Sequence, residues 1–320
     1  MKWFKKIIYV FLALLGLIFL FGLVLAFWPA THRVTNEGIT RQEAATLRQQ
    51  YESPHQLFTA SDGETLFLRV WNPDSIEPRK RDIAVLIFHG FTAYSGPYDM
   101  AGIPFSEGGY TTFGLDYRGH GLSGGNRGDS PGKKRWIGDL TDAIKYLRSQ
   151  GYARIVVLGH SLGVAAAMCT ADSVPQEISG LVLLSGAYES RPGINKPIPL
   201  FQQVRILASA LFRPAYQSVE YYREGMHMTA DSLFTYHYTP RFFTMLDVKK
   251  LRLPEDLNIP VLVGVGDRDE LFSVEKVQEF YDLIPGNKKQ LIVMKNTTHA
   301  EIPRESWEKI VQWLDQTYLD

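Results

Sequence analysis

The chain has 320 residues, of which 45% are hydrophobic and 21% are charged, an ordinary composition for a folded protein. Its 34 lysines and arginines balance its 34 aspartates and glutamates, so no net field attracts nucleic acid and we expect no nucleic-acid partner. Cys169 is the only cysteine, which excludes an internal disulfide and any zinc site built from several thiolates.

The amino terminus carries an apolar segment long enough to cross a membrane. Residues 7–28 contain no charged side chain, and a membrane-spanning helix needs about 20 such residues. A cleaved signal peptide usually has a shorter apolar core, of about 7 to 15 residues. We therefore expect an uncleaved anchor over residues 1–30, although Ala26 and Ala30 leave cleavage open.

The charges that flank this segment predict its orientation. Lys2, Lys5 and Lys6 precede it, whereas Arg33 and Arg41 are sparser after it. The positive-inside rule then places the amino terminus in the cytoplasm. The rest of the chain is expected on the outer side, in the periplasm or another extracytoplasmic space.

Residues 31–54 are polar and predict a partly helical connector. The folded body is expected from residue 55, because residues 56–60 and 64–71 are strand-like and flank a Ser-Asp-Gly hairpin turn. The apolar run 83–88 predicts a strand covered on both faces. Phe91 lies in the turn directly after this strand.

The next part of the body alternates helices and strands. Residues 98–107 predict a helix that ends at two glycines, and residues 110–115 predict a strand. The glycine-rich stretch 116–128 lacks the spacing of nucleotide-binding loops. We interpret it as a structured loop beneath the active site, followed by a helix over residues 131–150.

GHSLG at residues 159–163 is the motif around which the chain is organised. An apolar run precedes it and an alanine-rich helical pattern follows it. Strand, tight turn and helix form the context in which G-x-S-x-G makes a nucleophile elbow. Ser161 is therefore the candidate nucleophile. A serine hydrolase holds its oxyanion with the N–H of the residue after the nucleophile, here Leu162, and with an N–H from the turn after an earlier strand, here that of Phe91.

Residues 187–257 break the alternation of strands and helices. A strand is expected at 181–184, and the pattern up to there favours a mostly parallel sheet with helices on both faces. The next seventy or so residues contain no clear strand but many aromatic residues, and a structureless loop of that length is unusual in a compact domain. We expect a helical cap that divides the core into residues 55–186 and 258–320 and whose rings line a site for an acyl chain.

The remaining candidate catalytic residues lie near the carboxyl end. A strand predicted over residues 260–266 is followed by Asp267 and Asp269, and His299 is the only histidine after these acids. The chain order nucleophile, acid, histidine makes His299 the candidate base and leaves the acid open. In the cap, His227, His237 and Asp231 fit no metal-ligand spacing, so we expect no metal site.

Several motifs together resemble the α/β-hydrolase superfamily: HGF at 89–91, DYRGHGLSGGNRG at 116–128, GHSLG and the late Asp and His. The RGHGxSxGxRG pattern is similar to the monoacylglycerol lipase and lysophospholipase branch, which is also grouped with the S33 serine aminopeptidases. The resemblance covers about residues 57–319 and departs from the family at Val164, where a glycine is usual. It implies an α/β-hydrolase fold with a mostly parallel, eight-stranded type of sheet and an inserted helical cap. The one preceding transmembrane helix has no counterpart in the family and is expected from residues 7–28 alone.

The resemblance also implies a function. In this family the acid that pairs with the catalytic histidine is the Asp of a G-x-x-D pattern, which here runs from Gly266 to Asp269 and favours Asp269 over Asp267. With Ser161 and His299 it implies a serine hydrolase that cleaves lipid-like carboxylic esters, of the monoacylglycerol or lysophospholipid type, through an acyl-enzyme and without a cofactor. The apolar segment 7–28 adds the expectation that this enzyme is anchored in a membrane.

Two other functions remain open at this point. Related folds include aminopeptidases, whose substrate amine would call for acidic residues at the cap mouth, such as Glu189, Glu220 or Glu224. A non-catalytic binding protein on the same fold is the third reading. The complete set of serine, acid and histidine argues against it.

Overall fold

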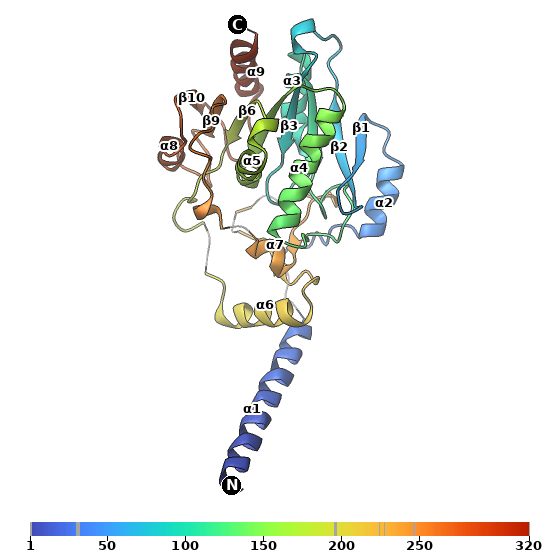
Figure 1. Ribbon diagram of the computed structural model, residues 1–320, viewed down its shortest axis with the longest axis vertical. Helices are drawn as coiled ribbons and strands as arrows, with labels where there is room; N and C mark the ends of the chain where they lie inside the picture. The colour runs from blue at the N-terminus through green and yellow to red at the C-terminus, as the bar shows by residue number, and fades with distance from the viewer. Residues whose placement is uncertain are drawn as a thin grey trace.

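The computed structural model describes residues 2–29, 33–194, 197–223, 225, 226, 228–245 and 247–319. A long apolar helix, α1 (Lys2–Phe27), projects from an α/β body, and helix α6 (Leu200–Phe212) crosses the end of α1 nearest the body (Figure 1). A short helix, α2 (Arg41–Gln49), lies in the expected connector and begins with a capping box between Thr40 and Glu43.

The body is built on one sheet of eight strands in the order β1-β2-β4-β3-β5-β6-β9-β10. Strands β1 and β2, and β2 and β4, pair antiparallel, and every other neighbouring pair is parallel. This confirms the mostly parallel sheet that the alternation of strands and helices predicted and the eight strands that the family resemblance implied. The strands are β1 (His55–Thr59), β2 (Thr65–Trp71), β3 (Ile83–Phe88), β4 (Thr111–Asp116), β5 (Arg154–His160), β6 (Gly180–Leu184), β9 (Val261–Gly266) and β10 (Lys289–Met294).

Helices cover both faces of the sheet because alternate strand residues point to opposite sides. Leu86 and Val157 face one buried cluster, which α4, α5 and α8 complete. Val85 and Leu158 face the other, which α3 and α9 complete. These helices are α3 (Asp99–Glu107), α4 (Lys133–Ser149), α5 (Leu162–Ser173), α8 (Val274–Asp282) and α9 (Arg304–Tyr318). Single 3-10 turns lie at Pro78–Lys80, Gly96–Tyr98, Pro175–Glu177 and Val248–Lys250.

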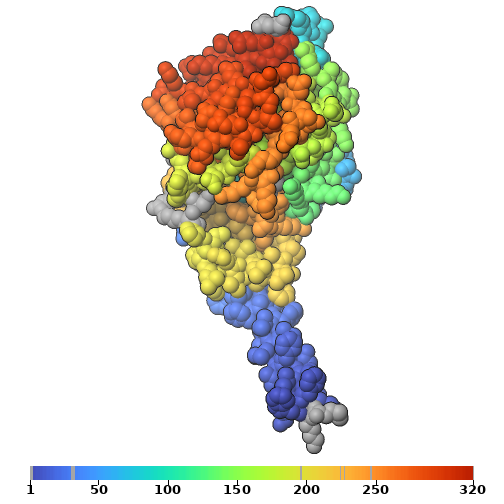
Figure 2. All heavy atoms as spheres, turned by 60° about the vertical axis from the view of Figure 1, so that its left-hand side comes forward, coloured from blue at the N-terminus to red at the C-terminus, as the bar shows by residue number. Residues whose placement is uncertain are grey.

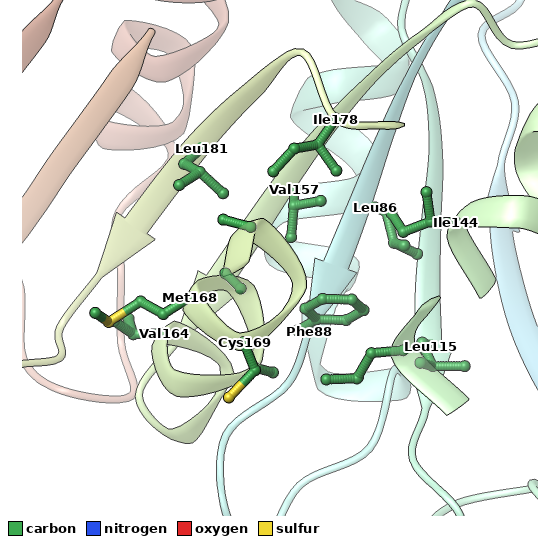
Figure 3. Packing of buried hydrophobic residues seen from close by; sticks show 14 of the residues in the cluster. Leu86, Phe88, Leu115, Ile144, Val157, Val164, Met168, Cys169, Ile178 and Leu181 are labelled. Atoms are coloured by element: carbon green, nitrogen blue, oxygen red, sulfur yellow. The ribbon is translucent and has the colours of Figure 1, made fainter. Parts of the chain in front are cut away.

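Helix α5 is the most deeply packed of these helices. Figure 3 shows Met168 and Cys169 of α5 beside Phe88 and Val157 of the central strands, and all four are buried. Burial raises the pKa of the Cys169 thiol to about 11, so this cysteine packs as a small apolar side chain. The helix that follows Ser161 is thereby held rigidly on the sheet.

The segment between β6 and β9 is less helical than the sequence led us to expect. It contains α6, the short helix α7 (Pro240–Thr244), and the two-residue strands β7 (Val219–Glu220) and β8 (His237–Tyr238), which pair antiparallel. The rest of its described residues form turns, one 3-10 turn and irregular chain. Such short strands leave no run of alternating residues for sequence reasoning to detect.

Two glycines allow β5, α5 and the end of β3 to pack closely at the GHSLG turn. A Cβ at Gly163 would overlap the carbonyl oxygen of Phe88, and a Cβ at Gly159 would overlap the carbonyl oxygen of Gly163. These neighbours are backbone atoms that cannot rotate away. Glycine at both positions is therefore a packing requirement of the turn.

We expect Gly163→Ala to lower the free energy of unfolding by about 3 kcal/mol, because the added methyl group must push strand β3 and helix α5 apart. Gly16→Ala in α1 is the control, since no atom lies within 4 Å of the added methyl group. It should change the free energy by less than about 1 kcal/mol. Urea unfolding of the two variants beside the wild type measures both values, and equal effects would contradict the packing argument.

Candidate active site

Ser161 sits in a sharp turn between β5 and α5. Its φ of 57° is unusual for a residue with a side chain. The turn is held by hydrogen bonds from the Ser161 N–H to the carbonyl of Leu184, at 3.0 Å, and from the Val164 N–H to the carbonyl of Ser161, also at 3.0 Å. This is the local geometry of a nucleophile elbow.

The structure brings Ser161, His299 and Asp269 together in one row. The distance from His299 Nε2 to Ser161 Oγ is 3.0 Å, and that from His299 Nδ1 to Asp269 Oδ2 is 3.2 Å. The three residues follow β5, β10 and β9, which end at the same edge of the sheet. A base in hydrogen-bond contact with both a hydroxyl and a carboxylate has the geometry that general-base activation requires.

It is Asp269, and not Asp267, that lies against His299. Asp269 is 1% exposed, and its Oδ1 also accepts the N–H groups of Leu271 and Phe272, at 2.8 and 2.9 Å. Burial alone would favour the neutral acid, but the hydrogen bond and charge of His299, together with these N–H groups, outweigh it and hold the pKa of Asp269 below its usual value. Asp267 is exposed and accepts the N–H of Thr297 at 3.3 Å.

The two expected oxyanion donors belong to segments that adjoin Ser161. Leu162 is the first residue of α5, so its N–H has no partner within the helix. The loop after β3 approaches closely, since a Cβ on Gly90 would be 3.3 Å from the Cβ of Ser161. Phe91 and Leu162 line the same cavity as Ser161.

That cavity has a volume of about 300 Å³ and a mostly apolar lining. Tyr221, Phe242 and Phe243 reach it from the segment between β6 and β9, so this segment lies over the carboxyl ends of the strands. Val164, the departure from the family motif, lines the cavity beside Met168 of α5. The cavity has the character of a site for an apolar group.

A buried hydrogen-bond network that sequence reasoning missed links three loops of the site. The N–H of Gly90 donates to Tyr98 Oη at 2.8 Å, Tyr98 Oη is 2.8 Å from His160 Nδ1, and His160 Nε2 is 2.9 Å from the carbonyl oxygen of His299. Burial is the main cause that lowers the pKa of His160 to about 3, and the charge of the nearby His299 acts in the same direction. The neutral ring then accepts from Tyr98 and donates to His299, which assigns its tautomer.

Glu270, which no sequence signal singled out, contacts both the backbone of His299 and an arginine. Its Oε2 accepts the N–H of His299 at 3.0 Å, and its Oε1 pairs with Arg223 at 3.2 Å. Arg223 belongs to the segment between β6 and β9. The backbone of His299 is thus connected to that segment through one carboxylate, which no motif would have indicated.

The acidic residues considered as binding groups for a substrate amine or a metal have other partners. Glu189 pairs with Lys249 at 2.7 Å, and Glu220 accepts the N–H groups of Arg33 and Val34 at 2.7 and 2.8 Å. Glu224 and His227 lie outside the described residues, and Asp231 accepts the hydroxyl of Tyr94 at 2.8 Å. Among the residues that the structure describes, no group of three or more His, Cys, Asp or Glu could hold a metal ion.

Comparison with known proteins gives consistent matches. The family model described as serine aminopeptidase, S33, matches residues 79–306. The chain is 25% identical over 271 residues to the monoacylglycerol lipase of Mycolicibacterium smegmatis, a match that covers 79% of this chain and 92% of that protein. The structure of a soluble variant of monoglyceride lipase from Saccharomyces cerevisiae, in complex with a substrate analog, has a TM-score of 0.67 at 18% identity and covers 90% of this chain and 99% of that chain.

A further curated relative is longer than this chain. The chain is 23% identical over 277 residues to an uncharacterized protein of Escherichia coli and spans 47% of that protein's length. The structural neighbour, at 18% identity, shows the shared fold.

The buried network predicts a stability effect at Tyr98. Tyr98→Phe keeps the ring but leaves the N–H of Gly90 and Nδ1 of His160 without their partner, so we expect the free energy of unfolding to fall by about 2 kcal/mol. Tyr152→Phe is the control, because the Tyr152 ring packs on Phe113 and its hydroxyl bonds to none of the described residues. Urea unfolding measures both, and an unchanged Tyr98→Phe protein would contradict the network.

Proposed function

The chain belongs to the serine aminopeptidase S33 family, in the monoacylglycerol lipase-like branch of the α/β-hydrolases, and on that premise we propose that it is a serine hydrolase of lipid-like carboxylic esters. The observation that carries the proposal is the row of Ser161, His299 and Asp269 at the edge of an apolar cavity. The row provides a nucleophile and its base, and the cavity provides room for an acyl chain.

The proposed reaction proceeds through an acyl-enzyme. His299 Nε2 takes the proton of Ser161 as Oγ attacks the ester carbonyl, and the N–H groups of Phe91 and Leu162 hold the oxyanion. Asp269 orients the ring of His299 and stabilises its protonated form. The alcohol leaves with the proton from His299, and a water activated by the same nitrogen then releases the acid.

The cavity lining supports a neutral acyl substrate over a peptide with a free amine. Among its described lining residues there is no Asp or Glu. Glu189 and Glu220, which could have bound an amine, are held by lysine side chains and backbone N–H groups. A monoacylglycerol or a lysophospholipid fits this chemistry, and the first is the substrate named for the mycobacterial relative.

The anchored arrangement is part of the proposal. Trp3–Phe27 is long and apolar enough to cross a membrane, with a mean hydropathy of 3.0. We assign residues 1–30 to the anchor, 31–54 to a connector, 55–186 and 258–320 to the hydrolase core and 187–257 to the cap. The lysines before the span favour a cytoplasmic amino terminus and a catalytic body on the outer side.

Ser161→Ala tests the nucleophile. We expect the wild-type chain to react with a fluorophosphonate and to hydrolyse a short soluble ester, and the variant to lose the label and at least about 1,000-fold in turnover. Ser190→Ala, which removes a second hydroxyl from the same cavity, should keep both activities. A folded wild-type chain that neither labels nor turns over would refute the proposal and favour a binding protein.

Removal of residues 1–30 tests the anchor. We expect the shortened chain to keep its turnover of a soluble ester, because the proposed catalytic groups lie in the body, and to lose most of its turnover of a monoacylglycerol held in vesicles. Turnover of both substrates is measured at equal enzyme concentration. Equal rates of the two chains on the vesicle-held lipid would show that the segment does not deliver the enzyme to its substrate.

A further inference from the structure

The loop that carries the proposed acid lies where the segment between β6 and β9 meets the body. This acid loop, residues 267–272, follows β9. Figure 2 shows the yellow and light-orange surface of that segment directly against the orange-red surface of the carboxyl-terminal part of the body. The body holds the start of the loop, because the N–H of Arg268 donates to the carbonyl of Thr297 at 3.0 Å. The residues after Arg268 also have partners in the segment.

Arg191 of that segment binds the acid loop twice. Its Nε donates to the carbonyl oxygen of Asp269 at 2.9 Å, and its backbone N–H donates to the carbonyl oxygen of Leu271 at 2.7 Å. The N–H of Leu271 in turn donates to the carboxylate of Asp269 at 2.8 Å. The turn that holds the Asp269 carboxylate against His299 is therefore bound at two of its carbonyl groups by one arginine of the segment.

His299 is held through both polar groups of its backbone. Its N–H donates to Glu270 Oε2 at 3.0 Å, and its carbonyl oxygen is 2.9 Å from His160 Nε2. The bond to Glu270 is charge-assisted, because its acceptor is a carboxylate. His299 lies in a loop outside any helix or strand, so no helix turn or sheet ladder fixes its backbone. The position of its ring therefore depends on these two bonds.

The other oxygen of the Glu270 carboxylate is bound from the later part of the same segment. Arg223 Nη2 lies 3.2 Å from Glu270 Oε1. Two residues before Arg223, the ring of Tyr221 stacks on that of Phe91 at 4.5 Å, and both rings line the cavity beside Ser161. Residues 221–223 thus contact the loop of one expected oxyanion donor directly and the backbone of the expected base through Glu270.

The pair of Arg223 and Glu270 contributes more to position than to stability. Their side chains are 17% and 44% exposed, and ion pairs with that much access to water add little to the free energy of unfolding. Proton transfer is more sensitive, because it requires a heavy-atom distance of about 2.6 to 3.2 Å. The two bonds of the His299 ring are 3.0 and 3.2 Å long, at the upper end of that range. A small shift of the His299 backbone is enough to exceed it.

We propose that Glu270 is a positioning residue that sets the place of His299 in the site. Arg223 and Arg191 complete the arrangement, because the first binds the Glu270 carboxylate and the second binds the acid loop from the same segment. Glu270 touches no reacting atom and acts through the backbone of His299. The inference rests on the proposed function and deepens it, because the geometry of the expected acid and base then depends on the segment that covers the cavity.

Kinetics of the full chain on a short soluble ester test the role of Glu270. We expect Glu270→Ala to lower kcat at least about tenfold, because the ring of His299 is misplaced, and to change KM less than about twofold, because no cavity residue is altered. Glu270→Gln keeps an oxygen that accepts the N–H of His299, so its kcat should return to within about threefold of the wild type. An unchanged kcat in Glu270→Ala would overturn the proposal.

Glu189→Gln is the matched control. Glu189 is 51% exposed, pairs with Lys249 at 2.7 Å and joins the segment to α8 through Lys276 at 3.6 Å. It therefore belongs to a similar surface ion pair between segment and body, but its described partners lie outside the loops of Asp269 and His299. Its kcat and KM should match those of the wild type. An equal loss of kcat in Glu189→Gln and Glu270→Ala would assign the effect to attachment of the segment and overturn the positioning role.

A double-mutant cycle tests the route through Arg223. Arg223→Gln alone should lower kcat about threefold, and it should have no further effect when added to Glu270→Ala, because the carboxylate through which it acts is gone. Effects that multiply would contradict this route. Urea unfolding of the same variants should give free energies close to that of the wild type, since the pair is exposed.

A proton resonance separates this inference from the proposed function. The Nδ1–H of His299 faces Asp269, and its chemical shift in the histidine-labelled full chain reports on that hydrogen bond without any substrate. We expect the resonance to move in Glu270→Ala and Arg191→Gln and to stay in place in Glu189→Gln. A resonance that does not move in Glu270→Ala would overturn the positioning role. Movement in a chain whose wild type hydrolyses no ester would refute the proposed function and leave the placement of His299 by Glu270 intact.

Discussion

The close packing at the GHSLG turn is the constraint on which the rest of the site depends. Ser161 keeps a positive φ because Gly159 and Gly163 allow strand β5, helix α5 and the end of β3 to meet at backbone contact. This contact brings the loop of Gly90 and Phe91 against Ser161 and leaves the N–H of Leu162 at the start of a helix. A side chain at either glycine would move all of these groups at once.

Around this turn, buried polar groups hold together loops that are distant in sequence. The neutral ring of His160 connects Tyr98, and through it Gly90, to the backbone of His299. Each of these groups has a partner, so the low dielectric of the interior strengthens the network instead of penalising it. Glu270 extends the connection to the segment between β6 and β9 through Arg223. The position of His299 is therefore coupled to the chain that covers the cavity.

Apolar surface is distributed unevenly between the body of the molecule and its amino-terminal end. The body buries its apolar residues in two clusters on the faces of the sheet. Helix α1, and Leu200, Leu207 and Leu211 of α6, leave their apolar side chains exposed at one end of the molecule. Large exposed apolar surfaces of this kind mark contact with a membrane or a partner. The proposed anchor accounts for the exposed apolar surface of α1.

The sequence by itself determined the elements whose signals are local. Uninterrupted apolar runs predicted β3 and β5, the G-x-S-x-G spacing predicted the turn at Ser161, and chain order singled out His299. The choice of Asp269 needed a family resemblance, and the structure places that carboxylate against His299. The catalytic roles of Ser161, Asp269 and His299 remain predictions.

Only the tertiary structure decided the rest. The network of Tyr98 and His160, the link through Glu270, the short strands β7 and β8 and the union of α6 with α1 all join residues far apart in the chain. A local pattern cannot encode such contacts, because they depend on which surfaces the folded chain brings face to face.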